Sequence, residues 1–225
     1  MPVSQRKVRQ QLCEIGRRIW LKGFCAGTDG NYSCRIGENR ILCTPSGMGK
    51  GFLKPDDLCT VDMDGHQIAG KRKRTSEIRL HLAVYRNRAD VGAVIHTHAP
   101  HATAFALAGV ELPRGIYPEA EVSLGAVRTA KYVTPGDQRL ADSIVPFIKD
   151  SNAVLLARHG TITFAEDLEQ AYCRLEMLEA YARIVLLARQ LGSLKPLSRQ
   201  EMKELEDARK GSSQRRVHHG RSVSP

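Results

Sequence analysis

Three histidines, His96, His98 and His101, lie within six residues of one another in the segment VIHTHAPHATA. On an extended chain, residues two apart project from the same face, so His96 and His98 can reach a single metal ion. Satisfied or merely exposed histidines explain an H-x-H pair equally well, so the pair alone leaves both interpretations open. His101 comes three residues after His98 on a predicted helix, which should turn its side chain away from the pair.

Two further residues favour a metal site. His159 lies in the segment RHG directly after the apolar run AVLLA, and strand ends in α/β folds commonly present functional groups. Glu77 lies at the start of a predicted helix, where its carboxylate could bind the ion or act as a base. Three imidazoles with one exchangeable position form a usual catalytic site for Zn²⁺, which stabilises an enolate formed from a bound substrate. Mn²⁺, Co²⁺ and Fe²⁺ suit the same ligands.

Three polar turns have compositions suited to phosphate. Their glycines let backbone N–H groups approach an anion, and their Ser, Thr and Asn side chains supply further donors. We expect Ser76 to cap a helix, which would place the third turn at a helix N-terminus. Ordinary turns share this composition, but the third turn also includes Glu77, which suggests a phosphate bound next to a metal. The turns are residues 28–31 (TDGN), 44–47 (TPSG) and 75–77 (TSE).

Hydrophobic periodicity predicts the elements that position these residues. Apolar residues three or four apart predict helices, and short apolar runs between Gly-rich turns predict strands. Helices and strands mix without a regular βαβ period, which favours a layered α/β domain over a barrel. The predicted helices are 4–22, 76–85, one that begins near Pro100, 137–148 and 167–191, and the predicted strands are 32–36, 40–43, 58–61, 91–96, 153–156 and 161–164.

The composition is that of a folded globular protein, with 42% hydrophobic and 26% charged residues among 225. No continuous apolar segment follows the first positive charges, and no apolar run approaches membrane-spanning length. We therefore expect a cytoplasmic protein without a membrane partner. Six cysteines without a C-x-x-C pair favour reduced core thiols over disulfides or a zinc cluster.

The net charge of +10 raises the question of a nucleic-acid partner. The segment from Arg209 onward supplies five of these charges, and the KRKR run at residues 71–74 supplies four more. The tail is rich in Ser and Gly, which indicates a disordered extension. Aromatic residues make up only 5% of the chain, too few for a basic face interleaved with aromatics. We expect solvated charge and no nucleic-acid partner.

In this order, the segments resemble the class II aldolase/adducin family over roughly residues 5–195. The resemblance rests on GTDGNYS, TPSG, TSEIRLHLAVY, AVIHTHAPHATA, VTPG and LLARHGTI. It implies that His96, His98 and His159 bind zinc, and that Glu77 is both a fourth ligand and the catalytic acid/base. The phosphate site that it implies consists of Gly30, Asn31, Ser46, Gly47, Thr75 and Ser76.

The resemblance also implies an architecture: a three-layer α/β/α domain with a mainly antiparallel central sheet, assembled as a homotetramer with active sites at subunit interfaces. Tyr117 matches a tyrosine that acts, in the aldolases, from the neighbouring subunit as a proton donor. Simple packing is the alternative role for Tyr117. We expect residues 1–197 to form the family domain, and residues 198–225 to form a C-terminal helix and a basic tail.

The implied function is that of a zinc-dependent aldolase, which reversibly cleaves a ketose 1-phosphate of the L-fuculose type into dihydroxyacetone phosphate and an aldehyde. Two departures concern the aldehyde end: Pro135 replaces an aromatic residue, and no tyrosine follows Tyr181. A sugar-phosphate epimerase, dehydratase or decarboxylase of the same family is an alternative, as is a non-catalytic, adducin-like association module. Related dehydratases use a glutamate near Glu119 and Glu121, although surface carboxylates also explain these two residues.

Overall fold

A computed structural model describes residues 5–207 of the chain. In this part of the chain, eight strands form one sheet in the order β4-β3-β2-β1-β5-β8-β7-β6. All neighbouring strands pair antiparallel except β6 and β7, which are parallel. The prediction of a mainly antiparallel sheet is therefore confirmed. The strands are β1 (Asn31–Gly37), β2 (Arg40–Cys43), β3 (Cys59–Val61), β4 (Gln67–Ala69), β5 (Ala93–Thr97), β6 (Arg128–Ala130), β7 (Ala153–Leu156) and β8 (Gly160–Ala165).

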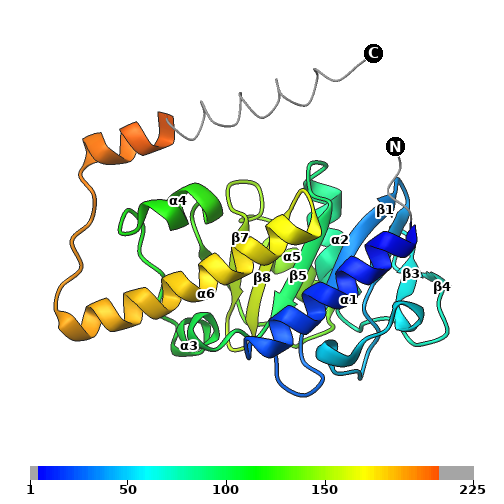
Figure 1. The fold of residues 1–225 in the computed structure, drawn as a ribbon. Coiled ribbons are helices and arrows are strands. Elements are labelled where there is room, and N and C mark those ends of the chain that lie inside the picture. Colours follow the sequence, from blue (N-terminus) through cyan, green and yellow to red (C-terminus); the bar gives the residue numbers. More distant parts are fainter. Residues whose placement is uncertain (1–4, 208–225) are drawn as a thin grey trace, which may run out of the picture.

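Helices cover both faces of the sheet (Figure 1). Helices α2 (Ile78–Asn87) and α5 (Gln138–Ile144) pack on one face, and the other face carries α1, α3, α4 and α6. The three-layer α/β/α prediction is confirmed. The four helices of the second layer are α1 (Gln5–Leu21), α3 (Pro100–Ala108), α4 (Pro118–Leu124) and α6 (Leu168–Leu191), and two short 3₁₀ helices are Lys50–Phe52 and Pro55–Asp57.

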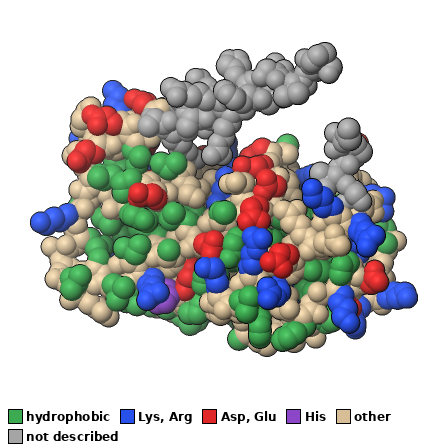
Figure 2. All heavy atoms as spheres, in the orientation of Figure 1, with side chains coloured by type: hydrophobic (Ala, Val, Ile, Leu, Met, Phe, Trp, Pro, Cys, Tyr) green, Lys and Arg blue, Asp and Glu red, His purple; other side chains and the backbone are tan. Residues whose placement is uncertain are grey.

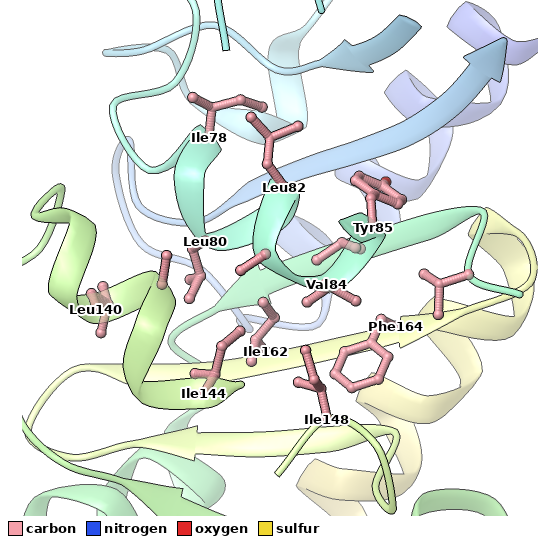
Figure 3. Packing of buried hydrophobic residues seen from close by; sticks show 14 of the residues in the cluster. Ile78, Leu80, Leu82, Val84, Tyr85, Leu140, Ile144, Ile148, Ile162 and Phe164 are labelled. Atoms are coloured by element: carbon pink, nitrogen blue, oxygen red, sulfur yellow. The ribbon is translucent and has the colours of Figure 1, made fainter. Parts of the chain in front are cut away.

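The side chains of each central strand divide between the two layers. Ile95 of β5 packs in the cluster beneath α1 and α6, whereas its neighbour Val94 packs beneath α2 and α5. Figure 3 shows the second cluster, where Leu80 of α2 lies on the side of Leu140 and Ile144 of α5. Because β5, β7 and β8 are buried on both faces, they read as mostly continuous buried runs rather than as an alternation of buried and exposed residues.

Element boundaries mostly follow the sequence pattern, with informative exceptions. Helix α2 begins at Ile78 with Glu77 as its N-cap residue and no side-chain cap, so Ser76 does not cap it; the Thr75 hydroxyl accepts the Glu77 backbone N–H at 3.2 Å. Helix α5 ends at Ile144, four residues before its predicted end. The short elements β4, α4 and β6 were not predicted, since each has three to seven residues and too few positions to show a period.

Residues 199–207 are helical. The chain leading to them is held by the Leu197 backbone N–H, which donates to the Gly115 carbonyl at 2.6 Å. The basic tail predicted from Arg209 onward lies outside the described residues. A domain division between residues 197 and 198 stays a prediction.

None of the helices in residues 5–207 combines the length and apolarity needed to cross a membrane.

All six cysteines are unpaired thiols, and Cys25, Cys34, Cys43 and Cys59 are buried as predicted, whereas Cys173 is exposed.

Candidate metal and phosphate site

His96 is the penultimate residue of β5, and His98 follows one residue after the strand ends. Strand β1 pairs with β5 so that Asn31 lies opposite His96, and β8 pairs with the other side of β5. His96 is fully buried, and the His98 side chain is 27% exposed. The H-x-H pair therefore lies at the end of a central strand, between two neighbouring strands that hold its backbone.

His159 lies in the tight turn that joins β7 to β8. Arg158, just before it, adopts the left-handed conformation with φ of 56°, which costs a non-glycine residue roughly 1–3 kcal/mol. Gly160 follows, and a Cβ there would lie only 2.5 Å from the Thr97 carbonyl oxygen and 2.6 Å from His98 Cδ2. The absence of a side chain at Gly160 lets the turn pack against the H-x-H pair and brings His159 to it.

The three predicted histidine ligands meet in space. Each offers a ring nitrogen, and these nitrogens lie within 4.8 Å of one another. The ring centroids are 4.7 to 5.1 Å apart and tilted rather than stacked. Converging ring nitrogens at this spacing can share one metal ion.

The outer nitrogens of His96 and His98 fix the tautomers of these rings. Nδ1 of His96 lies 2.9 Å from the Thr161 carbonyl oxygen, which can only accept, so Nδ1 carries the proton. Nδ1 of His98 lies 3.2 Å from a carboxylate oxygen of Asp29, which has the same consequence. Nε2 of both rings is therefore a lone pair, buried and without a hydrogen-bond partner in the described structure. Metal-binding histidines are typically held in this way.

Glu77 directs its carboxylate at the same point. Its Oε2 lies 3.3 Å from His96 Nε2 and its Oε1 lies 3.4 Å from His159 Nε2. Burial alone would raise the pKa of Glu77, but His96, then His159 and the Asn31 amide, outweigh burial and hold the pKa well below its usual value. The carboxylate and the ring nitrogens thus favour positive charge between them, which a bound cation would supply, so the residues fit a metal ion.

A pocket of about 370 Å³ opens beside these residues. Glu77, His98 and His159 line one part of it. All six residues predicted for phosphate line the rest: Gly30, Asn31, Ser46, Gly47, Thr75 and Ser76. Two features require glycine at position 30: its φ is 75°, and a Cβ there would lie 2.9 Å from the His96 carbonyl oxygen. The sequence-predicted metal and phosphate groups therefore share one cavity.

Five residues that line the pocket were not predicted as site residues, among them Asp29, Pro135 and Lys50. Asp29 orients His98, as described above, and Pro135 lines the pocket where an aromatic residue was expected. Lys50 is 1% exposed, and its ammonium donates to the carbonyls of Thr28 and Met48, both at 2.7 Å. It is the one lysine or arginine lining this cavity. No local sequence pattern marks Lys50 as a pocket residue, because its contacts with Thr28 and Met48 depend on tertiary folding.

We expect Lys50→Met to lower the free energy of unfolding by about 2 kcal/mol, because two partly buried carbonyls lose a charged donor, and each hydrogen bond to a charged group contributes about 1.5–3 kcal/mol before water replaces part of it. Denaturant unfolding measures the difference. Lys54→Met, at an exposed position four residues along the chain, is the matched control and should stay within about 0.5 kcal/mol of the parent. Equal stability of the two variants would show that the Lys50 bonds contribute nothing.

His81 is a fully buried histidine, and burial lowers its pKa to about 3. In the unfolded chain His81 binds a proton near pH 6.5, whereas in the folded chain it stays neutral until a much lower pH. Below pH 6.5 the unfolded chain therefore binds more protons, and the free energy of unfolding decreases as the pH falls. Between pH 6.5 and about 5.5 the Glu77 carboxylate is ionised in both states and contributes almost no slope.

In metal-free protein we expect His81 to contribute a loss of roughly 1.4 kcal/mol per pH unit below pH 6.5. Chemical unfolding of the parent and of His81→Gln at pH 6.5, 5.5 and 5.0 measures this contribution, and the variant should show the smaller slope. Parallel pH profiles would mean that His81 is protonated in the folded chain.

The remaining predicted residues lie elsewhere. His101 turns away from the metal group, as expected, and its Nδ1 contacts a Glu179 oxygen at 2.7 Å. Tyr117 precedes α4, where its ring stacks on Tyr181 with centroids 6.1 Å apart, and it does not line the described pocket. Glu121 is not a surface carboxylate, because it is buried and accepts the Gly115 N–H at 2.5 Å.

Comparisons with known proteins identify related enzymes. The family profile described as Class II Aldolase and Adducin N-terminal domain matches residues 10–186. A 5-deoxy-D-ribulose 1-phosphate aldolase of Bacillus thuringiensis serovar kurstaki is 36% identical over 201 residues, covering 89% of this chain and 94% of the relative. A 3-oxo-tetronate 4-phosphate decarboxylase of Escherichia coli is 32% identical over 187 residues, covering 81% and 88% respectively.

A solved structure of an L-fuculose 1-phosphate aldolase has the same fold, with a TM-score of 0.85 and 32% sequence identity. The alignment covers 93% of this chain and 98% of that one. Together with the profile match over most of the chain, this similarity shows that the protein belongs to the class II aldolase and adducin family, as a class II aldolase enzyme.

Proposed function

We propose that the protein is a zinc-dependent aldolase that reversibly cleaves a ketose 1-phosphate into dihydroxyacetone phosphate and an aldehyde. One observation supports this most directly: the converging nitrogens of His96, His98 and His159 lie next to Glu77, in a pocket whose remaining lining is rich in hydroxyl, amide and glycine residues. The relatives include aldolases for two different sugar phosphates. The identity of the aldehyde product is therefore to be determined by experiment.

Zinc would be held by Nε2 of His96 and His98, by His159 and by the Glu77 carboxylate. Bound there, it would polarise the substrate carbonyl and lower the energy of negative charge on the adjacent carbon. Imidazole and carboxylate ligands also accept Mn²⁺, Co²⁺ or Fe²⁺, and zinc is favoured because three neutral imidazoles with an exchangeable position are its usual catalytic set.

Glu77 would remove the proton from the hydroxymethyl carbon of dihydroxyacetone phosphate in the condensation direction and return it in cleavage. Its depressed pKa keeps it ionised at neutral pH, and burial leaves its carboxylate little competing water. The Asn31 amide holds one of its oxygens at 2.8 Å, which fixes the direction of approach. Asn31, Ser46, Thr75 and Ser76 would bind the phosphate with neutral donors.

Tyr117 would donate a proton to the aldehyde oxygen from a neighbouring subunit of a homotetramer. Two observations support a shared site: Tyr117 does not line the pocket of its own chain, and apolar side chains are exposed around α3 and α6. Leu107, Leu187 and Leu191 are 59%, 47% and 92% exposed, and hydrophobic atoms gather on this side of the molecule in Figure 2. Such a surface on a folded domain is typical of association.

Tyr117→Phe should lower ketose 1-phosphate cleavage by about a hundredfold or more, while proton exchange of dihydroxyacetone phosphate continues, because only cleavage needs protonation at the aldehyde oxygen. Mixing this variant with Glu77→Gln subunits, after dissociation and reassembly, should restore part of the activity if sites are shared. No recovery in mixed oligomers would place Tyr117 outside the site or within a single subunit.

A decarboxylase is the second candidate, because a 3-oxo-tetronate 4-phosphate decarboxylase is among the relatives. It would use the same phosphate and metal groups, with carbon dioxide leaving in place of an aldehyde. The test is direct: the purified protein is supplied with zinc and with L-fuculose 1-phosphate, 5-deoxy-D-ribulose 1-phosphate or 3-oxo-tetronate 4-phosphate. Dihydroxyacetone phosphate formed from either ketose supports the aldolase, and carbon dioxide from the third substrate alone overturns it.

We place this activity in the cytoplasm, where phosphorylated sugars are retained by their charge. The six unpaired thiols are consistent with a reducing compartment.

A further inference from the structure

A line of buried polar side chains extends behind Glu77, between α2 and β1. Tyr85 OH lies 2.9 Å from Ser33 Oγ, which lies 2.7 Å from His81 Nδ1. His81 Nε2 lies 2.6 Å from Asn31 Oδ1, and Asn31 Nδ2 lies 2.8 Å from Glu77 Oε2. The chain joins the outermost residue, Tyr85, to the carboxylate without a gap.

The carboxylate sets the direction of every bond in this chain. An ionised carboxylate can only accept, so the Nδ2 side of Asn31 must face Glu77 and its Oδ1 must face His81. Oδ1 can only accept in turn, so His81 carries its proton on Nε2. The neutral ring then accepts at Nδ1 from the Ser33 hydroxyl, and Ser33 Oγ accepts from the Tyr85 hydroxyl. Only one arrangement satisfies all five residues.

This arrangement matters because Asn31 contacts the metal ligand Glu77 and also lines the pocket predicted to bind phosphate. One N–H of its amide goes to Glu77, and the other is left for an anion in the pocket that Asn31 lines. The backbone of Asn31 is fixed opposite His96 in the sheet, but nothing in strand pairing fixes which end of the amide faces the pocket. The Glu77 carboxylate and the donor on His81 fix the amide together, since a flipped amide would place its N–H₂ against the His81 N–H and its oxygen against the carboxylate.

We propose that His81 is a positioning residue that holds the Asn31 amide with both N–H groups toward the site, and so couples the phosphate group to the metal ligand Glu77. Ser33 and Tyr85 act behind it by selecting the Nε2–H tautomer. The inference rests on the proposed function for the identity of the two ligands, an anionic phosphate and a divalent metal. Hydrogen bonds of this kind add little net stability, so apolar residues would fill the same space equally well. A role in positioning Asn31 explains why polar groups are buried here.

The test measures binding rather than turnover, on the full-length chain. Zn²⁺ is titrated into chelator-treated protein, and inorganic phosphate binding is followed by ³¹P NMR. His81→Met removes the hydrogen-bond donor to Asn31, whereas His81→Gln keeps an N–H₂ group at a similar distance. Asn31→Ala removes the amide through which we propose that His81 acts. We expect His81→Met to weaken both ligands by roughly tenfold to a hundredfold, as loss of a partner behind a metal ligand does, and His81→Gln to recover most of the loss.

If His81 acts through Asn31, the effects of the two substitutions should not add. In the Asn31→Ala background, His81→Met should cause no further weakening, whereas a general packing defect would add its effect to that of Asn31→Ala. A second measurement needs no variant: the ring ¹⁵N shifts of His81 in the parent protein should report a neutral ring with the proton on Nε2. A charged ring, or a proton on Nδ1, overturns the proposal even if His81→Met fails to fold.

The outcomes separate this inference from the function on which it rests. If the parent binds neither zinc nor phosphate, the proposed function fails and the inference fails with it. If the parent binds both and His81→Met binds them equally well, or loses affinity additively with Asn31→Ala, only the role of His81 is overturned. Joint weakening that disappears in the Asn31→Ala background supports it.

Discussion

Glu77→Gln should leave the fold intact and lower turnover by about a thousandfold, the middle of the range that a positioned acid/base contributes. The glutamine amide has the shape of the carboxylate but cannot accept a proton at neutral pH, and it neutralises the charge that faces His96 and His159 at 3.3 and 3.4 Å. Steady-state cleavage of the ketose 1-phosphate measures the loss, and thermal unfolding checks the fold.

Glu38→Gln is the matched control for this variant, because Glu38 is exposed in the turn between β1 and β2. The control should keep full activity. Undiminished turnover of Glu77→Gln would remove Glu77 from the mechanism and with it the proposed proton transfer.

The second large effect is expected on metal-dependent stability. At a free zinc concentration one hundred times the dissociation constant, the parent protein should gain about 2.7 kcal/mol. For a chain of this size that corresponds to a rise in melting temperature of roughly 5–11 °C. His159→Ala removes one of the converging nitrogens and should lose most of this gain, which differential scanning fluorimetry with and without zinc measures.

A second group of three potential ligands, Asp62, Asp64 and His66, provides the control. These side chains lie in an exposed turn, where the Asp62 carboxylate already accepts the backbone N–H groups of Asp64 and His66. His66→Ala should therefore keep the full zinc-dependent gain. If His66→Ala loses the gain while His159→Ala keeps it, the zinc site lies in that turn and not at the end of β5.

Residues with a local pattern could be predicted from the sequence. H-x-H followed by an apolar helix, and RHG after an apolar strand, each contain enough information to place an imidazole at a strand end, and the structure brings His96, His98 and His159 together. The layered fold followed from helix and strand periods, and the long helix α6 matched its predicted span within one residue, with Asp167 as its cap.

Residues that act through distant partners could not be predicted. His81 lies in a helical period like any core residue, and only the approach of α2 to β1 shows that it contacts Asn31, fifty positions earlier. Lys50 resembles a surface lysine in sequence, yet it is buried by the loops that it joins. Tertiary contacts decide such roles, and no spacing within a segment records them.

The capping prediction at Ser76 was wrong for a related reason. Ser76 and Thr75 both have hydroxyls that can accept a backbone N–H, and the structure uses Thr75, which is buried, while Ser76 is exposed and lines the pocket. This exchange leaves the Ser76 hydroxyl free of the helix. It is the arrangement that a phosphate-binding role for Ser76 requires.

Proton exchange tests the central claim most directly, because it isolates the step assigned to Glu77 and requires no knowledge of the aldehyde. Zinc-loaded protein is incubated with dihydroxyacetone phosphate in D₂O and followed by NMR, beside a chelated sample and the Glu77→Gln variant. The account predicts that the parent exchanges one of the two protons on the hydroxymethyl carbon, and that the chelated sample and the variant do not. Bound zinc without exchange in the parent would contradict it.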